Sequence, residues 1–281
     1  MKSNVLPGVC LLAALSLAAI CGSAQTPAPT QQDPAALAII QQVGEHELAA
    51  YRHHGYYSFL NAERSDRTNQ HLWLEAVVET PQGKFRRLLR EDGQPLAPQR
   101  RQQEDARIAA EAADPAKLEA DSHAREQDEQ HAQSMFNYPP QMFVYAREGE
   151  SDGLLKISFR PNPAFQPSTY EQRVLHAMAG SVLIEPGALR LRQLDARITE
   201  DVKFGWGIIG EILPGGNMHL VRVHTTGDDY KPTLLDINMQ GHLLFFHTLS
   251  RTQHLTHRNF APLPPNLSVS EAGKMALAVT P

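Results

Sequence analysis

The alternation of apolar and polar residues predicts β-strands along most of the chain. Residues 71–78 and 84–90 alternate in this way and are joined by the turn-forming residues 80–83 (TPQG), so we expect a hairpin there. After residue 140 the strand pattern returns and continues, with turn residues between short segments. The expected strands are residues 141–147, 154–160, 181–184, 189–198, 202–213, 218–224, 233–239 and 243–257.

Helical spacing of apolar residues marks a second kind of segment. Residues 34–43 predict a short amphipathic helix, because Asp33 can cap it and Pro34 suits a first helical turn. Residues 170–177 predict another helical segment. The chain therefore combines a few helices with many strands.

A charged insert occupies residues 98–134. Its large apolar side chains are almost limited to Ile108 and Leu118, and the rest is mainly charged residues, glutamine and alanine. Pro115 divides it, because proline is tolerated at a helix start but not within a helix. We expect two short, mostly solvated helices between two strands. The alternative is a docking arm for a partner protein of the cell envelope.

The number of strands suggests their arrangement. Within residues 189–198 the apolar positions change phase between Leu191 and Leu194, as a bulge near Gln193 would produce, and bulges curve sheets. About ten consecutive antiparallel strands are too many for a flat sheet. We therefore expect a mainly β protein with helices (α+β), built on a strongly curved antiparallel sheet or partly closed barrel with a helical insert.

The first 24 residues are typical of a secretory signal peptide. Lys2 precedes an apolar run at residues 9–20, and small residues lead to a cleavage site near Ala24. We expect a periplasmic or secreted protein, with no transmembrane segment in the mature chain. Four parts are predicted: the signal peptide, residues 1–24; a flexible leader, residues 25–33; one curved-sheet domain, residues 34–262, including the insert; and a C-terminal tail, residues 263–281.

Cysteine usage and charge exclude several function classes. Cys10 and Cys21 both lie in the signal segment, so the mature chain has no disulfide and no thiol nucleophile. Lipidation of Cys21 is the minority alternative, since the bulky Ile20 precedes it. The net charge of −5 makes nucleic acid and anionic lipid headgroups poor partners for the chain as a whole.

One segment matches the G-x-S-x-G pattern of a hydrolase nucleophile. Residues 149–153 (GESDG) fit it, but that pattern needs a preceding strand and a following helix. Here a second strand follows, so Ser151 is interpreted as a hairpin-loop residue. We expect no catalytic residue and no enzyme activity.

The histidines do not form a recognisable metal site. There are 13, with His247, His254 and His257 close together in sequence and His242 just before them. On one strand His254 and His257 would point to opposite faces, and His247 and His257 would lie roughly 33 Å apart. We expect no metal and no cofactor, although a site assembled from several strands stays open.

Phe204, Trp206 and Ile208 are the candidate ligand-binding residues. They alternate with glycines in residues 204–208 (FGWGI), and no helix or lysine follows to complete a phosphate loop. On a strand the three would form one large apolar face opposite a bare one. They are either ordinary core or the lining of a cavity.

Several segments resemble a group of uncharacterised exported bacterial proteins related to outer-membrane lipoprotein-sorting proteins. They are residues 154–165 (LLKISFRPNPAF), 181–184, 189–198, 202–209 (VKFGWGII) and 243–253. The resemblance covers roughly residues 72–257 and concerns strand order rather than a catalytic motif. It implies a curved sheet enclosing an apolar cavity that shelters acyl chains. The long insert departs from the compact carriers.

These observations favour a non-enzymatic periplasmic binding or carrier module for a lipid, acyl chain or lipoprotein. The alternative is a structural or interaction protein of the cell envelope with a packed barrel and no ligand.

Overall fold

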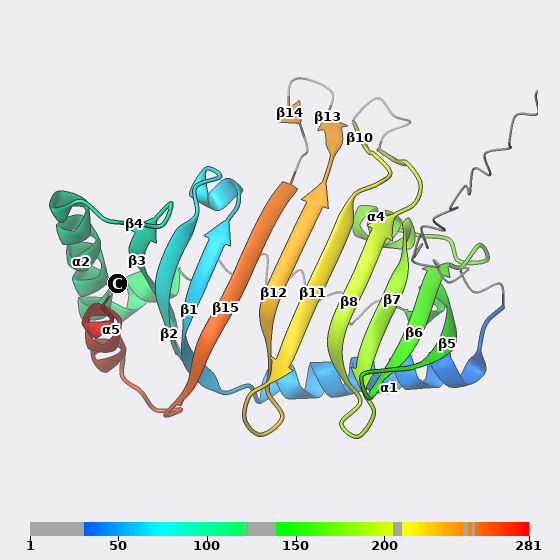
Figure 1. Cartoon of the computed structure of the whole chain (residues 1–281), viewed down its shortest axis with the longest axis horizontal. Helices are drawn as coiled ribbons and strands as arrows, with labels where there is room; N and C mark the ends of the chain where they lie inside the picture. Colours follow the sequence, from blue (N-terminus) through cyan, green and yellow to red (C-terminus); the bar gives the residue numbers. More distant parts are fainter. Residues whose placement is uncertain are drawn as a thin grey trace, which may run out of the picture.

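The computed structural model describes residues 31–120, 122, 139–204, 210–243, 247–248 and 251–280. Over these residues the chain is an α+β protein built on one 11-stranded antiparallel sheet, as predicted (Figure 1). The strands of this sheet are β1 (Tyr56–Arg64), β2 (Trp73–Thr80), β3 (Gly83–Glu91), β4 (Gln94–Pro95), β5 (Phe143–Ser151), β6 (Leu154–Pro161), β7 (Met178–Glu185), β8 (Arg190–Ile198), β11 (Asn217–His224), β12 (Tyr230–Met239) and β15 (Arg251–Leu263). The helices are α1 (Pro34–Arg52), α2 (Pro98–Ala113), α4 (Tyr170–His176) and α5 (Val269–Ala278), with the 3-10 turns η1 (Asp66–Thr68) and η3 (Pro140–Met142). Residues 115–120 are also helical.

The sheet is neither closed nor strongly curled. Its strand order is β4-β3-β2-β1-β15-β12-β11-β8-β7-β6-β5, so β4 and β5 form its edges. The prediction of a strongly curved sheet or partly closed barrel is therefore wrong. Closure would require the two edges to pair, and neither is suited to pairing. β4 has two residues and ends at Pro95, which lacks an N–H, while the Tyr145 carbonyl on β5 already accepts a hydrogen bond from the Asp33 N–H at 3.0 Å.

The predicted bulge near Gln193 is confirmed. Gln193 pairs with Leu183 of β7, but the next pair is Leu191 with Ile184, so Arg192 is an extra residue on β8. The bulge reverses the alternation along the strand. Leu191 and Leu194 consequently face the same side of the sheet. Without the bulge they would face opposite sides, because they are three positions apart in the chain.

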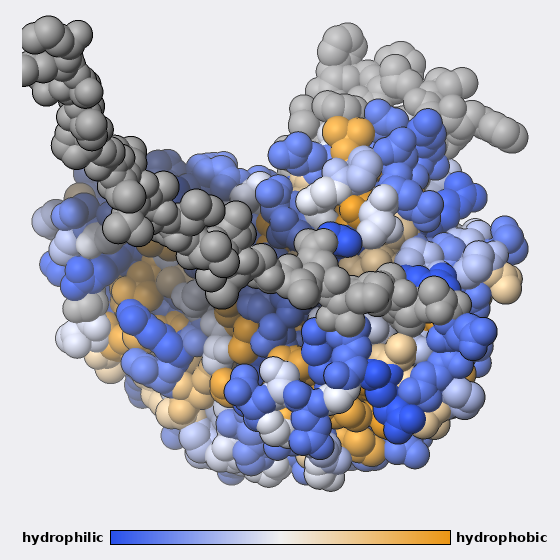
Figure 2. All heavy atoms as spheres, turned by 45° about the vertical axis from the view of Figure 1, so that its right-hand side comes forward, coloured by the Kyte–Doolittle hydropathy of each residue, from blue (hydrophilic) through white to orange (hydrophobic). Residues whose placement is uncertain are grey.

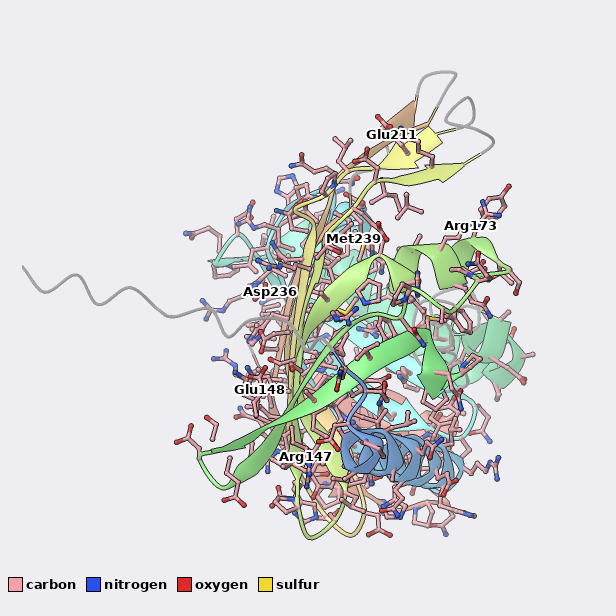
Figure 3. All side chains as sticks on the ribbon, turned by 90° about the vertical axis from the view of Figure 1, so that its right-hand side faces the viewer. Arg147, Glu148, Arg173, Glu211, Asp236 and Met239 are labelled. Carbon is pink, nitrogen blue, oxygen red and sulfur yellow. The ribbon has the colours of Figure 1, made fainter. Side chains whose placement is uncertain are left out.

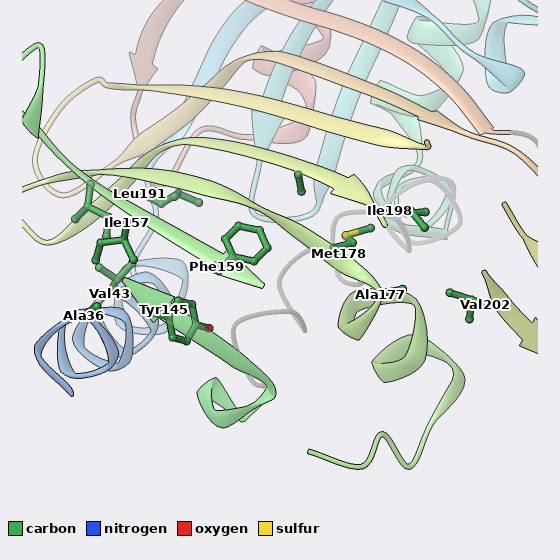
Figure 4. Close-up of a cluster of buried hydrophobic side chains, with 12 residues drawn as sticks. Ala36, Val43, Tyr145, Ile157, Phe159, Ala177, Met178, Leu191, Ile198 and Val202 are labelled. Atoms are coloured by element: carbon green, nitrogen blue, oxygen red, sulfur yellow. The ribbon is translucent and has the colours of Figure 1, made fainter. Parts of the chain in front are cut away.

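Strand alternation divides the sheet into two faces. The face that carries Ile157 and Leu194 packs against α1 and is called the α1 face. Edge-on, α1 and α4 lie on this side of the sheet, and Asp236 lies on the other, which we call the opposite face (Figure 3). Close to α1 the α1 face is tightly packed: Ala36 and Val43 of the helix join Tyr145 and Ile157 in one buried cluster (Figure 4). Figure 2 shows hydrophobic residues only in patches between hydrophilic ones on the side that it draws.

Helix α1 starts as predicted and runs nine residues further than expected. The Asp33 carboxylate accepts hydrogen bonds from the N–H groups of Ala35, at 2.9 Å, and Ala36, at 3.3 Å. The helix continues to Arg52 because Glu47, a residue that reads as solvated, is buried against the sheet. No helix in the described ranges is long and apolar enough to cross a membrane.

Two predicted long strands are each interrupted. Residues 202–213 form β9 (Val202–Phe204) and β10 (Gly210–Ile212), which pair with each other instead of continuing as one strand. Residues 243–257 likewise divide between β13 (Gly241–Leu243), β14 (His247–Thr248) and the first part of β15. β9, β10, β13 and β14 form a separate four-stranded sheet. The continuous apolar pattern gave no sign of where the chain leaves the main sheet.

The insert and the C-terminal segment form a second packed unit at the β2–β3 end of the sheet. The helical break before Pro115 is confirmed, and Ile108 and Leu118 are both fully buried against Val78 and Phe85 of the opposite face. Residues 263–281, predicted as a tail, contain α5, which begins with a capping box between Ser268 and Glu271. Helix α5 packs with α2 over these strands.

Gly273 of α5 lies against Ala112 of α2, and we predict that Gly273→Ala destabilises the protein. A Cβ at this position would lie 2.5 Å from the Ala112 Cβ, so the helices must move apart. The same substitution within an unconstrained helix stabilises by about 0.5–1 kcal/mol. Thermal unfolding should therefore show a lower Tm for Gly273→Ala. Gly187→Ala, where an added Cβ meets no atom within 4 Å, is the matched control; a higher Tm for Gly273→Ala would contradict the proposed crossing.

Candidate functional site

Six aliphatic side chains form a continuous row across the middle of the α1 face. Each is the direct cross-strand partner of the next. From β15 to β6 they are Leu255, Leu235, Leu220, Leu194, Val182 and Ile157. Neighbouring strands are about 4.8 Å apart, so this row, which we call the apolar floor, is about 24 Å long.

The middle of the apolar floor is incompletely covered. Ile157 is 0% exposed and Leu255 is 9% exposed, whereas the four side chains between them are half-buried. Along β8, Arg190 contacts α1 near one end of the strand, and at the other end Thr199 donates a hydrogen bond to the carbonyl of Ala177, which follows α4. Leu194 lies between these two attachments. The middle of the apolar floor is therefore only partly covered between these two attachments.

A buried ion cluster attaches α1 beside the apolar floor. The Glu47 carboxylate accepts hydrogen bonds from the Arg190 guanidinium, at 3.0 and 3.1 Å, and from the Leu191 N–H at 2.9 Å. Arg222 lies 2.8 Å from the same carboxylate. Burial opposes ionisation of Glu47, but the hydrogen bond from Arg190 and the charge of Arg222 outweigh it and hold its pKa below the ordinary value. The Arg190 guanidinium also stacks 4.7 Å from the Tyr230 ring centroid.

A second ion cluster closes the β1 end of the apolar floor. Leu255 pairs across the strands with Glu63, so the row of aliphatic residues ends at a carboxylate. Arg67 donates to Glu63 at 2.5 Å and to Glu75 at 2.7 Å, and Asn61 donates to Glu75 at 2.8 Å. Burial raises the pKa values of both glutamates, but Arg67 outweighs burial and the net direction is downward. Both carboxylates are therefore ionised and paired, which stops the apolar surface at β1.

The candidate ligand-binding residues predicted from the sequence are not among the residues of the apolar floor. Phe204 ends β9, away from the apolar floor, and its side chain lies outside the described residues, as do Trp206 and Ile208. The floor residues were missed because each lies in a separate predicted strand. Only the pairing and register of β6, β7, β8, β11, β12 and β15 align them into one row.

Ser151 lies in a hairpin, as the sequence analysis expected. It is the last residue of β5 and pairs with Leu154 of β6. Between them Asp152 and Gly153 have φ angles of 51° and 75°, the left-handed conformation of a two-residue hairpin turn. No helix follows the serine, so the backbone lacks the strand–turn–helix geometry of a nucleophile elbow.

The histidines bind acids and carbonyls of neighbouring strands. His219 Nδ1 lies 2.5 Å from Asp195 Oδ1, His254 contacts Asp236, and His257 Nδ1 lies 3.1 Å from the Pro232 carbonyl. β13 and β14 carry His242 and His247, whose side chains lie outside the described residues. In the part of the chain that the structure describes, no three histidine, cysteine or acidic residues could hold a metal ion together.

A separate cavity of about 430 Å³ lies between the β2–β3 turn, the end of α2 and the start of α5. Its lining includes Pro81, Ala112, Leu267 and Ser270, and none of the lining side chains is ionisable. It lies beside the packed insert rather than on the apolar floor. It offers no general acid, general base or charged ligand.

The chain matches no family model, no curated protein and no solved structure. The resemblance to proteins related to outer-membrane lipoprotein-sorting proteins therefore stays a prediction.

The Glu47 cluster yields a pH-dependent prediction. Glu47→Gln should lower the free energy of unfolding by about 3 kcal/mol near neutral pH, because it leaves the buried Arg190 and Arg222 uncompensated. Since the folded pKa of Glu47 lies below 4.5, its ionised form stabilises the fold above that pH, and the contribution is lost as the pH falls through the folded pKa.

Denaturant unfolding from pH 7 to pH 3 checks this prediction. The difference between wild type and Glu47→Gln should shrink as the pH falls. Glu45→Gln, an exposed substitution one half-turn away on the same helix, should match wild type throughout. An equal loss of stability in both variants would show that the buried ion cluster is not the cause.

Ser151 provides a test of the hairpin interpretation. We predict that a fluorophosphonate reagent does not label Ser151, because no base or oxyanion-binding turn accompanies it in the hairpin. Mass spectrometry of the treated protein, with Ser151→Ala as the control, measures this. A covalent adduct present in wild type and missing in Ser151→Ala would overturn the interpretation.

Proposed function

We propose that this protein is a non-enzymatic binding or carrier module that holds an apolar group of a lipid, acyl chain or lipoprotein on the apolar floor. The half-buried state of Leu235, Leu220, Leu194 and Val182 carries the proposal. Apolar surface left in contact with water costs about 25 cal/mol per Å². An apolar ligand that covers these side chains would remove that cost.

The shape of the apolar floor favours an extended ligand. Its length of about 24 Å exceeds the roughly 15 Å that one leaflet contributes to the hydrocarbon core of a bilayer. At β1 the apolar floor ends at the paired carboxylates of Glu63 and Glu75. A long acyl chain fits such a strip better than a compact ring system. This is an open strip on the sheet, in place of the enclosed cavity expected from the sequence.

The predicted export of the protein supports the same function. Residues 1–24, which lie outside the described residues, predict a signal peptide, so the mature protein would work in the periplasm or outside the cell. Lipids and lipoproteins of the cell envelope would be available there. A carrier needs no catalytic residue, and Ser151, the one candidate nucleophile, lies in a simple hairpin.

One observation favours the alternative, an interaction protein of the cell envelope without a ligand. Near α1 the α1 face is already filled, with Ala36, Ile157 and Ile184 each 0% exposed. If the rest of the face needs no ligand for stability, the sheet serves only as a scaffold. The charged insert at residues 98–134 would then be the surface for a partner.

Native mass spectrometry distinguishes the two functions. The full chain is expressed with its predicted signal peptide, purified without detergent, and examined intact and after solvent extraction. We expect a co-purifying acyl-containing molecule. A ligand-free mass, together with no binding of added fatty acid or phospholipid, would overturn the carrier function and favour the interaction protein.

A pair of variants locates the ligand. Leu220→Asn should weaken binding of a fluorescent fatty acid by roughly tenfold or more, because burial of a leucine side chain contributes about 1.5–3 kcal/mol. Val221→Asn is the matched control: Val221 is also half-buried and adjacent on β11, but it faces the other side of the sheet. Equal affinities of the two variants would place any ligand elsewhere.

A further inference from the structure

The ion cluster of Asn61, Glu63, Arg67 and Glu75, which we call the β1 cluster, contains a buried acceptor without a donor. Asn61 is 0% exposed, and its Nδ2 donates to Glu75 at 2.8 Å and to Glu63 at 3.3 Å. In the described part of the chain, the Oδ1 atom of the same amide accepts no hydrogen bond. A buried polar atom without a partner is unfavourable. The β1 cluster can therefore gain from one more hydrogen-bond donor.

Arg67 already supplies one cation to the β1 cluster. Its guanidinium donates to Glu63 at 2.5 and 3.2 Å and to Glu75 at 2.7 and 3.1 Å, but it does not reach the free Asn61 Oδ1. Glu63 and Glu75 are 4% and 2% exposed, whereas the Arg67 side chain is 34% exposed. Arg67 is therefore the charged member of the cluster that faces solvent. The carboxylates show what they accept, a cation with several N–H donors.

The guanidinium of Arg67 can be replaced without moving a strand. Arg67 lies in the three-residue turn η1, which follows β1 and contacts both β1 and β15. Its guanidinium also lies 5.4 Å from the centroid of the Trp73 ring. Leu255, the last residue of the apolar floor, is the direct cross-strand partner of Glu63, so their Cβ atoms are about 5 Å apart. A ligand on the apolar floor thus ends beside these carboxylates.

We propose that the ligand of the apolar floor carries a primary ammonium group, which replaces the Arg67 guanidinium between Glu63 and Glu75. This inference rests on the binding function proposed above and names the chemistry of one end of its ligand. An ammonium group has three N–H donors, enough for both carboxylates and for Asn61 Oδ1. Charge is conserved because one cation replaces another, and Arg86 stays 3.9 Å from Glu75.

The β1 cluster disfavours the other kinds of headgroup. An acidic headgroup would lie beside two ionised carboxylates, and like charges repel. A hydroxyl could donate to Asn61 Oδ1, but it could not take over the charge of Arg67. The other end of the apolar floor, Ile157, is 0% exposed and lies in an apolar cluster, which suits a hydrocarbon end. The ligand would therefore lie with its hydrocarbon end towards β6 and its ammonium group at β1.

Three ligands of equal chain length test the ammonium group. Dodecylamine, dodecanol and dodecanoate are titrated near neutral pH into the protein purified without detergent, and their Kd values are compared. We expect dodecylamine to bind roughly tenfold or more tightly than dodecanol, because hydrogen bonds to charged groups are the strong ones. Dodecanoate should bind most weakly.

Variants of the β1 cluster identify the residues. Asn61→Leu and Glu63→Gln should each remove most of the preference for dodecylamine over dodecanol. Glu79→Gln is the matched control, because Glu79 is another buried glutamate of this face, paired with Lys84 and Lys231 instead of Arg67. It should keep the preference. Circular dichroism establishes that each variant is folded.

Arg67→Met tests the exchange itself. This variant lacks the internal cation that competes with the ligand, so it should bind dodecylamine roughly tenfold more tightly than wild type does. Its affinity for dodecanol should be unchanged. An unchanged or weaker affinity for dodecylamine in the folded variant would contradict replacement of Arg67.

Two further comparisons assign the source of the ammonium group. Lysophosphatidylethanolamine and lysophosphatidylcholine differ in the N–H donors of the headgroup, and acylated peptides with lysine or norleucine differ in the amine of the side chain. Tighter binding of the first member of a pair supports the proposal. The first pair would assign the group to a lipid headgroup, and the second to a lipoprotein.

The outcomes separate this proposal from the carrier function. Equal affinities for the three dodecyl compounds, or a preference that Asn61→Leu and Glu63→Gln leave intact, would overturn the ammonium group and leave the carrier function standing. Absence of binding of all three compounds, in wild type and in Arg67→Met, would overturn the carrier function and the ammonium group together.

Discussion

The register of the antiparallel sheet is the constraint on which the rest of this structure depends. A slip of one residue in any pair of strands would move every side chain of that strand to the other face. The same register that aligns Leu220 with Leu194 and Leu235 also aligns His219 with Asp195 and Asp236. The apolar floor on one face and the cross-strand row of Asp195, His219, Asp236 and His254 on the other are therefore two consequences of one set of backbone hydrogen bonds.

Bulges adapt this register where helix α1 attaches. On β8 the extra residue Arg192 returns Leu191 to the α1 face, and beyond Leu234 on β12 an extra Thr233 changes the partner of Arg222 to Pro232. The groups that contact Glu47 are Arg190, the Leu191 N–H and Arg222, and all three lie next to these two bulges. A buried ion pair contributes little net stability compared with apolar packing, but it penalises any other position of the helix. Glu47 thus fixes where α1 lies, while Ala36 and Val43 supply the burial.

Local signals predicted local structure, and the errors came from contacts between distant segments. Alternation, the turn at residues 80–83, the break before Pro115 and the bulge near Gln193 were all visible in short windows. The predicted end of helix α1 was too early, because a glutamate such as Glu47 is typical of a solvent-exposed position. The sequence does not indicate that Arg190 and Arg222 lie beside it and allow its burial. Three other features depend on which strands become neighbours. They are the open edges of the sheet, the division of residues 202–213 and the row of floor residues. The capping box at Ser268 and Glu271 was present in the sequence and could have revealed α5.

The open sheet changes what a binding function requires of this fold. In a closed barrel the inner side chains are covered on all sides, and ligand capacity depends on the volume left empty. Here helix α1 covers only part of the α1 face. The half-buried residues of the apolar floor, such as Leu220 and Leu194, keep part of their surface in contact with water. Binding can then occur without opening a barrel, because the ligand would complete a layer that the helix begins. The buried carboxylates of Glu63 and Glu75 limit this layer at β1, so the length of the ligand, rather than an enclosing wall, would determine selectivity.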